Sequence, residues 1–153
     1  MTPTSRRMSA LSALLLLAAC LLAVPGQALA AGVAVTLSGS QEVPPNNSAG
    51  KGSGQVTVMP DGAVSGAITV TGMTPTVAHI HDGAAGKNGP VIVKLDKTDT
   101  GFAVPPGTRF NEAQMASFKA GNTYINVHSE AFPPGEIRGQ LNAAEPGRPP
   151  SAY

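Results

Sequence analysis

The sequence predicts an all-β fold, an antiparallel Greek-key β-sandwich with one short helix near residues 111–119. Two observations lead to this prediction. Short segments rich in Val, Ile and Thr alternate apolar with polar residues, which is the pattern of half-buried strands. Gly and Pro residues separate these segments about every 8–12 residues, which is the turn spacing of sandwiches and barrels.

The predicted strands follow one another from residue 33 onward. Pro60-Asp61-Gly62 favours a tight turn by its backbone preferences, so the strands on either side of it should form a β-hairpin. In chain order, the predicted strands cover residues 33–37, 55–58, 63–71, 77–81, 91–95, 123–128 and 136–141.

The segment 111–119 differs from the rest because it contains good helix formers. Asn111 is a favourable N-cap residue and Gly121 a favourable stop, with Met115 and Phe118 on one apolar face. The polar, glycine-rich segment 44–54 is predicted to be a flexible loop. The Pro-rich tail 143–153 is predicted to be disordered.

Residues 1–30 have the order of a secretory signal peptide. Arg6 and Arg7 precede an apolar run over 11–24, and small residues at Ala28 and Ala30 predict cleavage between Ala30 and Ala31. The apolar run is short for a membrane span. We therefore expect a periplasmic or secreted domain over 31–142. An alternative is a lipoprotein anchored at Cys20, whose context resembles a lipobox.

Composition excludes several classes of partner. The formal net charge is +1 and the chain has no basic run, which argues against nucleic acid or an anionic membrane as partner. No second apolar stretch has membrane length. Cys20 is the sole cysteine and should leave with the signal peptide, so the mature domain is expected to have no disulfide.

Three histidines are placed to act together. His79 and His81 flank Ile80 in a predicted strand, where residues two apart share a face. His128 lies in the strand 123–128, on the face that also carries Tyr124 and Asn126. Pairing of the two strands would bring three neutral imidazoles together, a donor set that suits copper or zinc. An oxidising compartment favours copper. The alternative is that the histidines are ordinary surface residues that bind no metal.

Other side chains are expected to complete or support such a site. Met73, Met115 and Asp82 are conceivable fourth ligands, although Met115 also suits core packing and Asp82 could orient an imidazole instead. Asn126 and Arg138 are expected beside the histidines by strand parity and motif. Arg138 shares a strand face with Glu136, so a structural ion pair is the alternative for this arginine.

Five sequence blocks follow one another along the chain: 37–45 (LSGSQEVPP), 78–83 (AHIHDG), 88–91 (NGPV), 120–129 (AGNTYINVHS) and 134–141 (PGEIRGQL). In this order they resemble the CHRD domain family, first noted in the developmental protein chordin. The resemblance implies an extracellular interaction module without an assigned catalytic activity. The His-x-His strand is also similar to that of copper/zinc superoxide dismutases, which implies a superoxide-dismutase-like or immunoglobulin-like sandwich. A full copper/zinc site is excluded because the chain has only three histidines.

These observations favour a binding role over catalysis. The expected function is to hold one copper, or alternatively zinc, through His79, His81 and His128 for metal sequestration, delivery or electron transfer. One alternative is a metal-free module that binds an extracytoplasmic protein. A second is a copper-dependent oxidoreductase similar to superoxide dismutase. The chain shows no nucleophile elbow and no carboxylate pair, which argues against hydrolysis.

Overall fold

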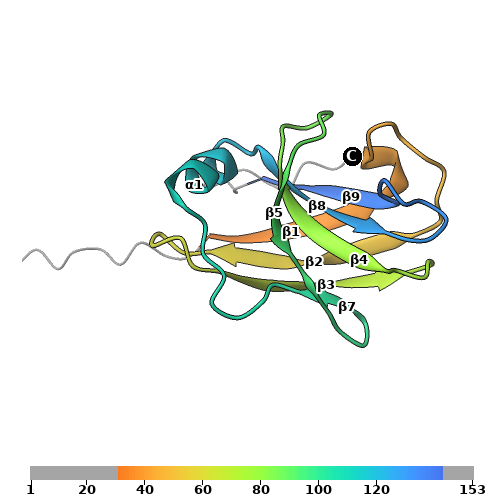
Figure 1. Ribbon diagram of the computed structural model, residues 1–153, viewed down its shortest axis with the longest axis horizontal. Coiled ribbons are helices and arrows are strands. Elements are labelled where there is room, and N and C mark those ends of the chain that lie inside the picture. Colours follow the sequence, from red (N-terminus) through yellow and green to blue (C-terminus); the bar gives the residue numbers. More distant parts are fainter. Residues whose placement is uncertain (1–30, 143–153) are drawn as a thin grey trace, which may run out of the picture.

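The computed structural model describes residues 31–142 (Figure 1). Within this range nine strands form one sheet in the order β5-β4-β8-β9-β1-β2-β3-β7-β6, and the paired strands are antiparallel. The all-β prediction with one short helix is confirmed. The predicted signal peptide, Cys20 and the tail 143–153 lie outside the described residues. The strands are β1 (Ala31–Ser38), β2 (Lys51–Val58), β3 (Val64–Thr71), β4 (Val77–Asp82), β5 (Val91–Lys94), β6 (Asp96–Lys97), β7 (Gly101–Ala103), β8 (Thr123–His128) and β9 (Ile137–Leu141).

The sheet folds over itself at the seam between β1 and β9. The two strands are paired at Ser38 and Arg138 alone, whereas β1 pairs with β2 along its whole length. A Cβ built on Gly139 would lie 2.4 Å from the carbonyl oxygen of Thr36, so only glycine lets β9 lie this close to β1. Figure 1 shows β4 running obliquely across β1 and β2, with β5 more steeply inclined, which gives a sandwich-like, partly open barrel.

The apolar core lies between the two parts of the folded sheet. Alternate residues of β1, β4 and β8 point into it, as the period-2 pattern predicts. Ile80, Ile125 and Val127 are almost completely buried there. Consequently the residues between them, including the histidines, lie on the opposite face of the sheet.

The helix α1 (Glu112–Lys119) begins and ends as predicted. The Asn111 side chain accepts a hydrogen bond from the backbone N–H of Gln114, and the Gln114 side chain accepts one from the backbone N–H of Asn111. This reciprocal capping box satisfies two N–H groups that the first turn leaves free. Phe118 is buried and Met115 packs against the core, so α1 closes one end of the sandwich.

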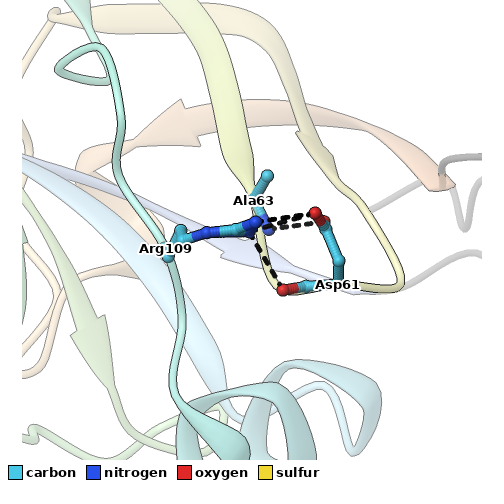
Figure 2. A network of polar contacts seen from close by, with 3 residues as sticks. All are labelled: Asp61, Ala63 and Arg109. Atoms are coloured by element: carbon cyan, nitrogen blue, oxygen red, sulfur yellow. Dashed lines mark hydrogen bonds and ion pairs between the residues drawn. The ribbon is translucent and has the colours of Figure 1, made fainter.

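The β2–β3 hairpin is tied to the segment before α1 by a surface ion pair (Figure 2). The Arg109 guanidinium donates to the Asp61 carboxylate at 2.8 and 3.0 Å and to the Asp61 carbonyl oxygen at 3.2 Å. The other carboxylate oxygen accepts from the backbone N–H of Ala63. Both charged side chains are more than half exposed, so the pair contributes only about 0–1 kcal/mol.

Two parts of the sheet differ from the prediction. The segment 44–54 is not a loop throughout, because β2 begins at Lys51. Its glycines fit a strand: a Cβ on Gly54 would lie 2.1 Å from the carbonyl oxygen of Ala67 in β3. The short strands β6 and β7 were not predicted. Among residues 31–142, no helix has the length and apolar character needed to cross a membrane.

Candidate metal centre

The three histidines lie together on the outer face of β4 and β8. In the β4–β8 register, His79 is opposite Asn126 and His81 is opposite Tyr124. His128 is opposite Val77, so it is the diagonal neighbour of His79. The predicted convergence of the three imidazoles on one face is therefore confirmed.

Their ring nitrogens are close enough to share an ion. One nitrogen from each histidine lies within 4.8 Å of the other two. Nδ1 of His79 is 3.1 Å from Nε2 of His128. The ring of His79 stands edge-on to the other two rings, with centroid separations of 5.6 Å to His81 and 5.0 Å to His128. The three rings thus surround one point instead of stacking on one another.

Backbone carbonyls fix the tautomers of two of the three rings. His81 Nδ1 lies 2.9 Å from the carbonyl oxygen of Gly89, and His128 Nδ1 lies 2.8 Å from that of Pro133. A carbonyl oxygen only accepts, so Nδ1 of each ring must carry the proton. In the neutral ring the lone pair is then on Nε2. This carbonyl-to-imidazole support is typical of metal-binding histidines.

The free nitrogen of His81 is the most unusual atom of the cluster. His81 is only 8% exposed, and among the described residues its Nε2 has no partner at full hydrogen-bond geometry, although the Asn126 side chain lies close enough to raise the pKa of the ring. A buried acceptor without a partner is disfavoured by about 1–3 kcal/mol. A metal ion bound at Nε2 would remove this cost in free energy.

Burial and neighbouring charges favour the neutral form of the two histidines of β4. Burial lowers the pKa of His79, and the neighbouring His128, His81 and Lys94 lower it further. Burial also lowers the pKa of His81, against the smaller opposing effects of the Gly89 carbonyl and the Asn126 side chain, which both stabilise the protonated ring. Only the neutral imidazole has a lone pair for a metal, so both shifts favour the ligating form.

A stack of side chains supports the cluster on its β9 side. The His81 ring stacks on Tyr124 at 4.8 Å between centroids, and the Arg138 guanidinium lies 3.5 Å from the centroid of Tyr124. Arg138 is 1% exposed and donates to the carbonyl oxygen of Ala84 and the side-chain oxygen of Gln140. The same loop carries the Gly89 carbonyl that orients His81, so Arg138 holds that loop over the site.

A buried carboxylate lies on the other side of Asn126. Glu42 is 6% exposed, and its Oε1 has no hydrogen-bond partner among the described residues. A Cβ built on Gly135 would lie 2.7 Å from both this oxygen and Nδ2 of Asn126, so the two groups border the same small space. Burial raises the pKa of Glu42 despite the opposing charge of Arg138.

The remaining predicted residues are separated by the structure into two groups. Asn126 and Arg138 lie beside the cluster, and face each other across β8 and β9. Met73 and Met115 pack against the apolar core instead, and the Asp82 carboxylate accepts a hydrogen bond from Ser117 of α1. The Glu136–Arg138 ion pair does not form, because Glu136 accepts from Ser48 while Arg138 bonds to the loop after β4.

Sequence reasoning missed Glu42 and the two carbonyl groups as parts of the site. Glu42 lies in a loop 37 residues before His79 in the chain, so no local periodicity connects it to the histidines. The carbonyls of Gly89 and Pro133 are backbone atoms, which side-chain patterns do not reveal. The one available signal was that Glu42 and Gly89 lie within the five CHRD-like sequence blocks and that Pro133 directly precedes the last of them.

Comparison with known families agrees with this architecture. The family model described as the CHRD domain matches residues 33–141. The chain belongs to the CHRD domain family. The match spans β1 through β9 and therefore includes all three histidines. Membership supports an extracellular-type module. Searches of curated proteins and of solved structures gave no significant match, so the similarity to superoxide dismutases has no further support.

Proposed function

We propose that this CHRD domain binds one copper ion, or alternatively zinc, through His79, His81 and His128. The observation that carries the proposal is the buried Nε2 of His81, which has no full hydrogen bond among the described residues and lies within 4.8 Å of ring nitrogens of the other two histidines, in a ring oriented by the Gly89 carbonyl. Three neutral imidazoles are a donor set that suits both metals. The role would be sequestration, delivery or electron transfer outside the cytoplasm.

Two features of the site support binding over a purely structural cluster. A structural cluster would pair its buried polar atoms, yet His81 Nε2 and Glu42 Oε1 both lack partners among the described residues. Both lie on the same loop-covered face as Asn126 and the cluster. The lowered pKa of His79 and of His81 also favours the unprotonated rings that a metal requires.

Titration calorimetry of the purified protein with Cu²⁺ and with Zn²⁺ tests the proposal. We expect one-to-one binding at micromolar Kd or tighter, about −8 kcal/mol. The double variant His79→Ala/His81→Ala should lose it. The matched control is Ser53→Ala/Gln55→Ala, two exposed residues that likewise share one face of a strand.

The possible results separate the candidate functions. Binding weaker than about millimolar, roughly −4 kcal/mol, would overturn the metal proposal and leave a metal-free interaction module. Equal binding by wild type and the histidine variant would place any metal elsewhere. Metal-dependent turnover of superoxide, lost in the histidine variant, would extend the proposal to a copper-dependent oxidoreductase.

A further inference from the structure

The contact between Asn126 and His128 carries an inference that rests on the proposed metal binding. Oδ1 of Asn126 lies 3.1 Å from Nε2 of His128. Since Nδ1 of His128 donates to Pro133, Nε2 of the neutral ring is an acceptor. In this tautomer two acceptors face each other at hydrogen-bond distance, and a cation between them, either a metal ion or a proton on Nε2, would join them.

The spacing of these atoms fits the edges of a metal coordination tetrahedron. Ligands about 2.0–2.1 Å from a common ion are about 3.3 Å apart when the geometry is tetrahedral. His128 Nε2 is 3.1 Å from His79 Nδ1 and 3.1 Å from Asn126 Oδ1. The His81 nitrogen, within 4.8 Å of the other two, needs only a side-chain adjustment to reach the same ion.

The amide nitrogen of Asn126 lies toward the side of the site that carries Glu42. Nδ2 of Asn126 and Oε1 of Glu42 both lie 2.7 Å from the position of a Cβ on Gly135. In this orientation the donor of the amide, and not its acceptor, lies toward the carboxylate.

We propose that Asn126 Oδ1 is the fourth ligand of the centre, and that the centre consequently selects a divalent ion over Cu⁺. An amide oxygen is a hard donor, which contributes to binding Zn²⁺ or Cu²⁺ but little to binding the soft Cu⁺. Three imidazoles and an amide are all neutral ligands. Glu42, whose Oε1 is unpartnered among the described residues, supplies negative charge near the bound ion.

The test compares two metals on two amide variants. Zn²⁺ and Cu⁺ affinities are measured by competition with chelators for wild type, Asn126→Leu and Asn88→Leu. Asn88 is the matched control, because its amide donates to the Val43 carbonyl and accepts from Arg138, supporting the loops without facing the histidines. We expect Asn126→Leu to weaken Zn²⁺ binding about tenfold or more and to leave Cu⁺ binding unchanged. Asn88→Leu should affect both metals alike.

The results distinguish this inference from the proposed function. If wild type binds neither metal, the proposed function fails and the fourth ligand with it. If wild type binds but Asn126→Leu changes both affinities equally, or neither, Asn126 is not a ligand while the histidine site stands. Should Asn126→Leu fail to fold, Asn126→Asp decides: a ligand at this position predicts tighter Zn²⁺ binding, and unchanged or weaker binding overturns the inference.

Discussion

At the scale of a single residue, the backbone conformation of Gly135 determines how closely the chain can approach the site. Its φ of +142° is one that side chains rarely adopt, and an added Cβ would press on Glu42 and Asn126 at 2.7 Å. We expect Gly135→Ala to lower the free energy of unfolding by about 1–3 kcal/mol, measured by urea denaturation. It should also displace Asn126 and weaken metal binding.

Gly86→Ala is the control for this substitution. Gly86 also has a positive φ, +73°, but no atom outside its immediate chain neighbours lies within 4 Å of its added Cβ. Gly86→Ala therefore introduces backbone strain without the contact. If both variants lose the same stability, the crowding against Glu42 and Asn126 contributes nothing.

Glu42 predicts a pH dependence of the metal-free protein. Burial raises its pKa above the ordinary 4.5, so between 4.5 and the raised value the folded state holds more protons than the unfolded state. Stability from this group is then full below pH 4.5 and decreases as the pH rises through the raised pKa. We expect Glu42→Gln to be more stable than wild type at pH 7 but not at pH 4, in urea denaturation. An equal difference at both pH values would contradict this.

Individual site residues were predictable only where strand alternation determines their direction. Alternation alone places Ile80, Ile125 and Val127 inside, and hence the histidines outside. It could not decide the fourth ligand, because candidates from other segments depend on loop paths. Met73 and Met115 pack against the core, and Asn126, predicted only as a neighbour, has the contacts of a ligand.

At the scale of elements, the loop between β4 and β5 is fixed by groups from other strands. Arg138 bonds to Ala84, Gln140 donates to the Gly83 carbonyl, and the Gly89 N–H donates to the Tyr124 hydroxyl. The loop in turn provides the carbonyl that orients His81. Loosening this loop should therefore disturb the site without removing a ligand.

Arg138→Lys tests this dependence. Lysine keeps the charge but lacks the planar fork that reaches Ala84 and Gln140 while lying over Tyr124. We expect a loss of about 2 kcal/mol in urea denaturation, as buried acceptors lose their donor, and faster hydrogen exchange across 83–89. Arg109→Lys, on the exposed Asp61 pair, should change stability by less than about 0.5 kcal/mol. Similar effects of the two variants would contradict a special role for Arg138.

Most of the strands and the helix could be predicted from the sequence, and the exceptions have physical reasons. Long alternating segments and the capped helix stand out by pattern alone. The strands β6 and β7 are two and three residues long, too short for a period to be recognised. The glycines at 52 and 54 suggested a loop, but both are paired with β1 and β3 in the sheet. Glycine is required at 54, where a Cβ would lie 2.1 Å from the carbonyl oxygen of Ala67.

At the scale of the whole molecule, the site forms because the sheet folds so that three loops, distant in sequence, cover the face that carries the histidines. The segment carrying Glu42, the loop 83–89 and the segment 129–136 come from separate parts of the chain and meet above β4, β8 and β9. Asn88 bonds to Val43, which connects the first two directly. The site exists only when the folded sheet is complete, so a bound ion should stabilise the entire domain.

Thermal unfolding measures this coupling. An ion that binds only the folded state adds about 2.7 kcal/mol when its concentration is 100 times its Kd, which should raise Tm by on the order of 10 °C. The rise should disappear with a chelator and be absent in His79→Ala/His81→Ala. Protons compete with the ion for the imidazoles, but the pKa of His79 and of His81 lies below the ordinary 6.5. The rise should therefore persist as the pH falls through 6.5 and vanish only at lower pH. If the rise in Tm were already lost at pH 6.5, this would contradict the lowering of the pKa of these two rings by burial.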